Sequence, residues 1–578
     1  MLDLLRTYRQ HRSAIAGISG LLLVGAVFET VALLLLVPIA TAVATGNDEI
    51  NRTVAGVTLQ GDAGTLVWVA LVSVVLGLAT RLTTVTFQTR LTVSVERQQR
   101  ARLYRGFLGA SWATQSAEPP GRFQWATNLT QGYAALLGVL LSSVKYILNL
   151  ATMLVAAVLV SPAGALSILA IGVALYFALQ PLLRAAKRAN RRMLKAMKAQ
   201  NETVAESVVM AGQIKAYGVA ARYWRHLMDM TNAVLHEKRT AQLLSGFVSP
   251  IYQAVAMIIA LGILAYATVR PVDVPALGAV ALLLLRSLSS AQGIQSAFVR
   301  YAELLPVLDN LEEWNTTYEM NQDESGSELI DRVDTLDIHD VSFTYPGADA
   351  ALESVSVSLL PGDDLGVVGP SGAGKSTLAQ VLLRFRAPTA GTFKVNGLDA
   401  SNIAAESFRR EVAYVPQTPL ILRGTVHENI ALYRDGISRD RAVDAARRAG
   451  VDAWITTLPD GYDTVIGPDT HGFSGGQAQR LSIARALAGQ PSLVVLDEPT
   501  SALDVDSEEL VTAALQGLPE HVIVVLIAHR MSTLRHCNRI VVLEDGRMTA
   551  SGSADEILRD NAFFQRAVAA GAFSSSGS

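Results

Sequence analysis

Cysteine is almost absent from this chain of 578 residues, in which Cys537 is the only one. A single cysteine excludes a disulfide framework within the chain and fits a reducing compartment for the C-terminal half. Charged residues are also scarce, at 17% of the sequence, and the formal net charge is −3. No global basic field therefore argues for nucleic acid as a partner. The apolar segments lack clusters of histidine and cysteine, which disfavours a metal as cargo.

Long uncharged runs fill the first 300 residues, whereas the remainder has the composition of a soluble domain. Six of these runs reach the roughly 20 residues that a helix needs to cross a bilayer. They lie near 14–45, 65–88, 134–160, 162–183, 246–269 and 272–296. Very short connections separate the third run from the fourth and the fifth from the sixth. We therefore expect two antiparallel helical hairpins among six membrane spans.

Basic residues cluster at alternate ends of the six runs. They precede the first run and follow the second and fourth: Arg6, Arg9, Arg12; Arg90, Arg97, Arg100, Arg102, Arg105; Arg184, Lys187, Arg188, Arg191, Arg192, Lys195, Lys198. The positive-inside rule then predicts a multi-pass protein of the plasma membrane with both termini in the cytoplasm. The seven basic residues from Arg184 to Lys198 can enforce this topology or hold anionic lipid headgroups.

Two long loops, about 89–133 and 184–245, keep helical periodicity and are predicted to continue the spans into the cytoplasm. Within them, the segments Gly109–Gln124 and Met210–Tyr217 are candidates for helices that couple the membrane part to a second domain; a plain solvated helix is the alternative for the latter. We expect a transmembrane domain over 1–317, a linker over 318–335, an α/β domain over 336–570 and a flexible tail over 571–578.

A complete G-x-x-x-x-G-K-[ST] phosphate loop spans Gly369–Thr377. In such a loop the glycines let backbone N–H groups close around phosphate oxygens, Lys375 reaches the outer phosphates, and the Ser376 hydroxyl ligates Mg²⁺. The residues that we expect to contact the nucleotide are Gly369, Ser371, Gly372, Gly374, Lys375, Ser376 and Thr377. The cofactors predicted from this loop are ATP and Mg²⁺.

Further residues downstream supply the parts that ATP hydrolysis needs. The apolar run from Leu493 ends in Asp497, which would hold the Mg²⁺ shell, and in Glu498, which would polarise water for attack on the γ-phosphate. Gln417 would reach Mg²⁺ and the attacking water, and His529 the γ-phosphate. Tyr345, before the loop, would stack on adenine; the alternative is an ordinary aromatic at a strand end.

The segment Phe473-Ser-Gly-Gly-Gln477 is a second nucleotide signature. With the motifs above, it makes residues 336–570 resemble the ATP-binding-cassette (ABC) family. That resemblance implies an ATPase whose signature completes the site of a facing second domain, through Ser474, Gly475, Gly476, Gln477 and Asp504. One cassette and six spans resemble a half-transporter of the exporter type. A second half-transporter is then required as partner, with a homodimer favoured and a heterodimer possible.

Two positions depart from the family pattern. Phe473 stands where leucine is usual, with little loss expected because the rest of the signature is intact. The segment Gly467-Pro-Asp-Thr470 replaces a Gly-Glu-x-Gly segment that couples many exporter cassettes to their membrane helices, which puts that contact in doubt.

Three ionisable residues lie inside predicted spans: Glu29, Lys145 and Arg286. Such residues are expensive in a bilayer, so they are candidates for a substrate pathway, and a structural ion pair is the alternative. The segment Val27–Leu33, with Pro38 beyond it, resembles the first span of lipid-linked oligosaccharide flippases. Amphipathic, lipid-linked and peptide cargo all remain open.

The fold class predicted is thus a six-helix transmembrane bundle with long cytoplasmic helical extensions, followed by an α/β phosphate-loop cassette domain. The predicted function is ATP-driven export or lipid flipping by a dimer through alternating access. ATP-driven import through an exporter-like fold is the main alternative. An ATP-gated channel or a regulator is a further one.

Overall fold

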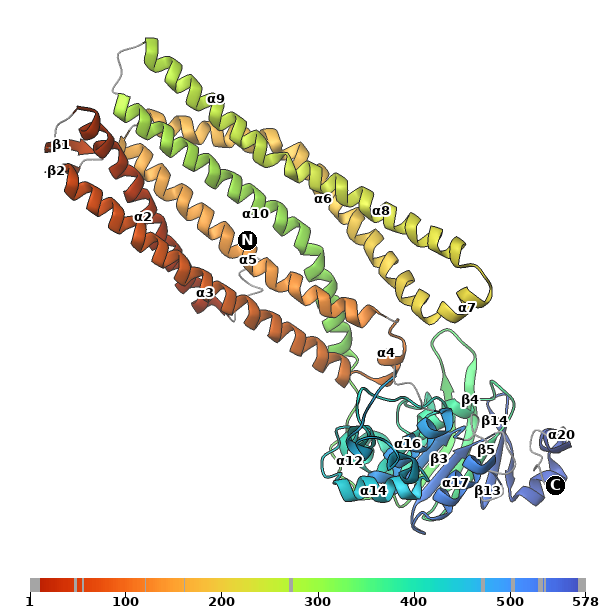
Figure 1. Cartoon of the computed structure of the whole chain (residues 1–578). Coiled ribbons are helices and arrows are strands. Elements are labelled where there is room, and N and C mark those ends of the chain that lie inside the picture. Colours follow the sequence, from red (N-terminus) through yellow and green to blue (C-terminus); the bar gives the residue numbers. More distant parts are fainter. Residues whose placement is uncertain are drawn as a thin grey trace. The chain divides into compact units, whose positions relative to one another are not determined.

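The computed structural model describes residues 11–45, 49–54, 57–119, 121–160, 162–269, 274–468, 474–499, 505–528, 534 and 537–569. They form two compact units (Figure 1). The first unit runs to Ala110 and again from Ala117 to Asn321, and the second comprises Ser111–Ser116 and the chain from Gln322 onward. The predicted class, a helical membrane domain followed by an α/β domain, is confirmed.

Long helices make up the first unit. They are α2 (Arg12–Thr45), α3 (Ala63–Gly109), α5 (Arg122–Val160), α6 (Pro162–Val209), α8 (Ala220–Gly246), α9 (Val248–Val269) and α10 (Val274–Met320). Five stretches of the described residues are long and apolar enough to cross a membrane: Arg12–Leu36, Ala63–Gly109, Arg122–Leu159, Ala165–Val209 and Ala220–Ile259. The predicted sixth span, 272–296, begins outside the described residues and otherwise lies in α10. Helices α3 and α6 continue well past their apolar parts, as expected.

The helices of this unit fall into two groups. Helices α2, α3, α5 and α10 pack along one another and form the first helix group. Its core includes Leu103, Leu136 and Leu311, all within 1% of complete burial. The guanidinium of Arg102 on α3 ties α10 to it, with N–O distances of 2.8 Å to Glu312 and 2.7 Å to Glu319. The second helix group consists of α6, α8 and α9: α6 packs along α8, α8 continues into α9 with helical backbone, and α9 packs against α10 of the first group.

Short elements connect the long helices. Strands β1 (Glu49–Val54) and β2 (Val57–Asp62) form an antiparallel hairpin between α2 and α3. Helix α7 (Ala211–Ala216) lies in the predicted coupling segment between α6 and α8. Helix α4 (Trp112–Ser116), in the other predicted coupling segment, belongs to the second unit, where the Trp112 ring centroid lies 5.3 Å from that of Phe385.

Two sheets organise the second unit. The larger has the order β14-β13-β5-β12-β11-β8, with bounds Arg547–Gly552, Arg539–Glu544, Asp364–Val368, Ile523–Ile527, Leu493–Asp497 and Val412–Val415. All its neighbouring pairs are parallel except β13–β14. The smaller, antiparallel sheet has the order β4-β3-β6-β7, with bounds Ala350–Leu359, Leu336–Thr344, Ala390–Val395 and Leu398–Asp399. A two-stranded pair joins β9 (Gly424–Thr425) to β10 (Val465–Ile466).

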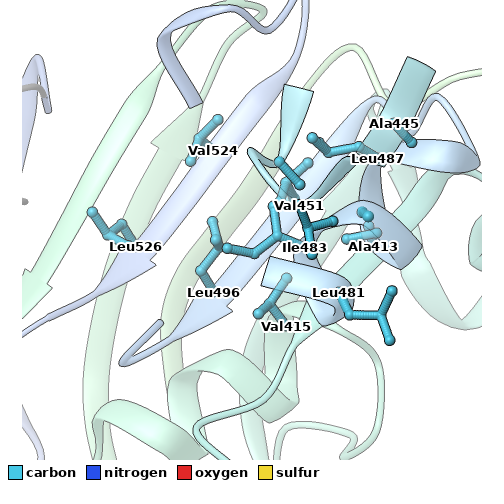
Figure 2. Packing of buried hydrophobic residues seen from close by; sticks show 14 of the residues in the cluster. Ala413, Val415, Ala445, Val451, Leu481, Ile483, Leu487, Leu496, Val524 and Leu526 are labelled. Carbon is cyan, nitrogen blue, oxygen red and sulfur yellow. The ribbon is translucent and has the colours of Figure 1, made fainter. Parts of the chain in front are cut away.

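Nine further helices belong to the described part of the second unit. They are α11 (Lys375–Leu382), α12 (Ala405–Glu411), α13 (Val426–Ala431), α14 (Arg439–Arg448), α15 (Asp452–Ile455), α16 (Gly475–Ala488), α17 (Val505–Gln516), α19 (Ala554–Asp560) and α20 (Ala562–Ala569). Strands β5, β11 and β12 are continuous apolar runs because both faces of the sheet are buried, one by helices and the other by α11 and the smaller sheet. In Figure 2, Leu481 and Ile483 of α16 lie beside Val415 and Leu496 of the sheet.

The parallel strands bring the expected site residues to one edge. The carboxyl ends of β5, β12, β11 and β8 meet there, because Val367 pairs with Ile527 and Ile527 pairs with Asp497. Ligands of open α/β sheets bind outside this edge. The loops that follow β5, β11 and β8 therefore carry the site.

Candidate functional site

The phosphate loop joins β5 to α11 and is shaped by glycine. Gly374 has φ = +95°, and a Cβ at this position would lie 2.3 Å from the Ala351 carbonyl oxygen. Only glycine fits such a backbone without displacing its neighbours. The loop leads directly into α11, whose first residues are Lys375, Ser376 and Thr377. Their unpaired N–H groups and the helix dipole favour an anion at this end.

Lys375 is held inside the loop. Its ammonium donates hydrogen bonds to the carbonyl oxygens of Gly369 (2.8 Å) and Pro370 (2.9 Å). Burial lowers the pKa of Lys375, and the charges of Glu498 and Asp497 raise it to a smaller extent. The three groups therefore share one electrostatic environment. The ammonium can exchange its two carbonyl partners for phosphate oxygens without leaving the loop.

The two predicted carboxylates follow β11. Asp497 is its last residue and is 9% exposed. Glu498 adopts a left-handed backbone, φ = +49°, while its N–H still donates to the Ile527 carbonyl at 2.9 Å. Such a conformation costs about 1–2 kcal/mol for a residue other than glycine, and it turns the side chain out of the sheet. Strained backbone of this kind clusters at functional sites.

Gln417, in the loop after β8, meets Glu498. Its side-chain amide Nε2 donates a hydrogen bond of 2.7 Å to a Glu498 carboxylate oxygen. This contact leaves the amide carbonyl oxygen of Gln417 as a possible metal ligand. Together with the exposed Ser376 hydroxyl and the Asp497 carboxylate it makes an all-oxygen donor set, which suits Mg²⁺. The described residues hold no cluster of three histidine, cysteine or acidic residues that would favour another ion.

Tyr345 lies beside the phosphate loop. Its hydroxyl is 3.2 Å from the Thr377 hydroxyl, and its ring meets the Phe343 ring edge-on at 4.9 Å. The Arg386 guanidinium lies over the ring, 4.8 Å from the centroid, and is held there by Gln380. Sequence reasoning missed Arg386. A base that stacks on Tyr345 must use the other face of the ring or displace this guanidinium.

The signature segment begins α16. Ser474 caps the helix by accepting from the Gln477 N–H at 3.1 Å, and the Gln477 side chain accepts from the Ser474 N–H at 2.9 Å. No hydrogen bond or ion pair joins Ser474–Gln477 to the phosphate loop among the residues that the structure describes. Phe473, Asp504 and His529 lie outside the described residues, as do the last two residues of Gly467–Thr470.

A charged cluster lies within the first helix group. Glu29 on α2 forms ion pairs with Arg81 of α3 and, at 2.8 Å, with Arg286 of α10. Lys145 of α5 lines the same small pocket, of about 20 Å³, as Glu29 and Arg81. The structure thus brings the three predicted ionisable residues to one region and adds Arg81, which the sequence reasoning missed. Arg81 lies within the predicted span 65–88, so a search of every span for charged residues would have found it.

The second unit matches a known protein family. Residues 352–501 match the family model described as ABC transporter. The second unit carries an ABC transporter domain. A bacterial Atm1-family ABC exporter, whose structure was solved with ATP bound, superposes with a TM-score of 0.82 over 98% of this chain and 100% of that one, at 22% identity. The ABC transporter domain is therefore fused to a helical membrane domain in an exporter fold.

Curated relatives match over shorter stretches. The ATP-dependent lipid A-core flippase of Chromobacterium violaceum is 41% identical over 42% of this chain and 42% of its own length. The cyclolysin secretion/processing ATP-binding protein of Bordetella pertussis is 40% identical over 40% and 33%. The multidrug transporter mdr2 of Aspergillus fumigatus is 42% identical over 38% and 28%. The alignments thus span less than half of each of these relatives.

Proposed function

We propose that the protein is an ATPase that drives export or lipid flipping across a membrane as a dimer. The observation that carries this proposal is the meeting of four side chains from three strand ends beside the phosphate loop. Lys375 follows β5, Asp497 and Glu498 follow β11, and Gln417 follows β8. The hydrogen bond between Gln417 and Glu498 and the shared electrostatics of Lys375 and the carboxylates support it. The exporter fold supports transport as its purpose.

Each of these residues has a distinct task in the proposed reaction. ATP with Mg²⁺ supplies a γ-phosphoryl group for transfer to water. Lys375 neutralises the outer phosphates, while Ser376, Asp497 and Gln417 provide oxygen ligands for the ion. Glu498 accepts the proton of the attacking water and is oriented by the Gln417 amide. His529 and Tyr345 are proposed to contact the γ-phosphate and the adenine.

The proposed dimer follows from the place of the signature. Ser474–Gln477 presents the N-terminus of α16, an anion-binding end, yet makes no hydrogen bond or ion pair with the phosphate loop of its own chain among the described residues. We propose that it serves the loop of a second half-transporter, with Asp504 beside it. A homodimer is favoured and a heterodimer is possible. Alternating access would then follow if ATP prefers the closed dimer.

The membrane part is proposed to span residues 1–317, joined by a linker over 318–335 to the cassette over 336–570. We propose that both termini and the cassette lie in the cytoplasm, which the distribution of arginine and lysine supports. The cargo is proposed to be amphipathic, lipid-linked or peptidic. Glu29, Lys145 and Arg286, with Arg81, are proposed to lie on its path, because half-exposed guanidiniums are too costly against lipid tails.

The proposal is tested with Glu498→Gln in the full-length protein reconstituted in vesicles. Loss of a general base typically slows a reaction about 10²–10⁴-fold, so ATP turnover should fall by that order while ATP binding persists. Lys375→Ala should instead abolish ATP binding. Glu406→Gln, at an exposed position of α12, is the matched control and should leave turnover unchanged. Near-normal hydrolysis by Glu498→Gln would remove Glu498 from the role of base.

The direction of cargo movement in the same vesicles distinguishes export from import. With ATP supplied only on the outside, only molecules whose cassette faces outward are active. Export or flipping then carries labelled cargo toward the face opposite the cassette, whereas import carries it toward the cassette. Ion currents that outlast single turnovers would instead support a channel.

A further inference from the structure

The first unit contains a pocket of about 280 Å³ that is distinct from the charged cluster. Its walls come from α5, α6, α9 and α10, that is, from both helix groups. They are almost entirely apolar and include Leu154, Val173, Phe177, Tyr252 and Leu288. The pocket is close to the lower limit of ligand-binding pockets and far larger than one water molecule requires.

Two buried polar side chains of α10, Ser287 and Gln295, line this pocket, and each is only 1% exposed. Among the residues that the structure describes, neither the Ser287 hydroxyl nor either polar atom of the Gln295 amide has a hydrogen-bond partner. Ser289, two residues further along α10, donates a hydrogen bond to the Leu285 carbonyl at 3.1 Å, as serines in helices often do. Buried polar groups are almost always satisfied, so the Gln295 amide points to a ligand with a hydrogen-bonding group.

The shape of the pocket fits a chain rather than a compact molecule. Ser287 and Gln295 are eight residues apart on one helix, which corresponds to about 12 Å at 1.5 Å per residue. Leu288 and Ala291 line the same side of α10 between them. The pocket therefore extends along the helix, with a polar group near each end and an apolar middle.

The open side of the pocket indicates where its occupant comes from. Leu169, Val173 and Phe177 of α6 line it and are 50%, 48% and 67% exposed. All three belong to a stretch, Ala165–Val209, that is apolar enough to cross a membrane. Apolar side chains that the protein leaves uncovered in such a stretch can contact lipid hydrocarbon. The chain itself does not cover this side of the pocket, so acyl chains of the bilayer can reach it.

We propose that this pocket binds one acyl chain of a bilayer lipid. The Gln295 amide donates to the carbonyl of the ester that carries the chain, and the chain runs along α10 toward Ser287. In the proposed orientation Gln295 is the end nearer the cytoplasm, so the lipid belongs to the inner leaflet. This deepens the proposed function by naming a lipid as ligand and rests on its membrane orientation, though not on ATP hydrolysis.

The test uses the full-length protein in nanodiscs that contain phosphatidylcholine with a photoactivatable group in its acyl chain. Because this lipid has no net charge, labelling of the pocket does not depend on electrostatic attraction to the charged cluster. We expect saturable labelling that maps to the lining residues of α6 and α10. Gly172 lines the pocket, and a Cβ there meets no atom within 4 Å, so Gly172→Leu fills the space. Labelling should fall by roughly tenfold.

Gly262→Leu is the matched control, because Gly262 is an exposed α9 glycine that also has free space and does not line the pocket. Its labelling should equal that of the unmodified protein. The ester contact is tested by competition: ester-linked lipid should outcompete ether-linked lipid about fivefold, the worth of one hydrogen bond. Gln295→Leu should abolish that preference while the labelling itself remains.

Labelling that is unsaturable, that maps elsewhere, or that survives in Gly172→Leu would overturn the proposal. An equal response to ester and ether lipids would overturn the role of Gln295. Failure of ATP hydrolysis in the same preparation would count against the proposed function and leave the labelling result intact. Stimulation of ATP turnover by the bound lipid, lost in Gly172→Leu, would identify the lipid as cargo or activator.

Discussion

Replacing Glu29 with glutamine tests whether the charged cluster is a structural ion pair or part of a cargo path. Glu29 is 13% exposed at its side chain, whereas Arg81 and Arg286 are about half exposed, at 50% and 52%. The 2.8 Å contact with Arg286 corresponds to about 6 kcal/mol of gross attraction at an effective dielectric constant of 20. Solvent around the arginines offsets most of it.

The expected loss in free energy of unfolding lies between the values measured for buried and for exposed ion pairs. Breaking a buried pair costs about 3–5 kcal/mol, and exposed pairs contribute about 0–1 kcal/mol. For a largely but not fully buried carboxylate with two half-exposed partners we expect Glu29→Gln to cost about 1–3 kcal/mol. Thermal unfolding in nanodiscs should register a fall of several degrees. Glu237→Gln is the matched control, since Glu237 pairs with the single Arg192 at the same 2.8 Å, and should cost less.

The cargo hypothesis adds a second expectation. With Lys145, the cluster holds three cations and one carboxylate, and Glu29→Gln raises its net charge from +2 to +3. If the cluster lies on the cargo path, an anionic amphiphile should stimulate ATP turnover at lower concentration in this variant. A purely structural pair predicts lower stability with an unchanged response. Unchanged stability and an unchanged response together would refute both interpretations.

Three further predictions concern the second unit. Gly374→Ala should abolish ATP binding because of its φ and the close backbone carbonyl, whereas Gly397→Ala, at φ = +78° with open space, should reduce only stability. Tyr345→Leu should weaken ATP binding about 5–100-fold if adenine stacks there, and Tyr345→Phe should not; calorimetry measures both. Burial raises the pKa of Cys537 to about 12, so this thiol stays neutral in the folded state while the unfolded one ionises near pH 9. Its contribution to stability is present below that pH and lost at up to about 1.4 kcal/mol per pH unit above it; melting curves of Cys537→Ala should lack this slope.

Helix and strand positions followed from local pattern. The predicted span 246–269 is α9, Val248–Val269, and the apolar run that ends in Asp497 is β11, Leu493–Asp497. Strand ends could also be predicted to converge, because parallel strands share an edge. These features depend on hydrophobic period and on motifs whose spacing is preserved along the chain.

Features that depend on side-chain register could not be predicted. Arg81 pairs with Glu29 only because α2 and α3 pack at one particular rotation and offset, which apolar periodicity does not specify. The Arg386 guanidinium over Tyr345 and the unsatisfied Gln295 likewise arise from contacts between distant segments. The grouping of Ser111–Ser116 with the second unit likewise depends on contacts between segments far apart in the sequence.

The acyl-chain pocket draws its walls from both helix groups, two helices from each. Arg102 links α3 to α10 within the first helix group. A movement of one group relative to the other would change the width of the pocket between them. An acyl chain bound there would stabilise the arrangement of the two groups in which the pocket is open. It would have to leave before an arrangement with a closed pocket could form. Membrane thickness and chain length would then set the pace of the conformational cycle.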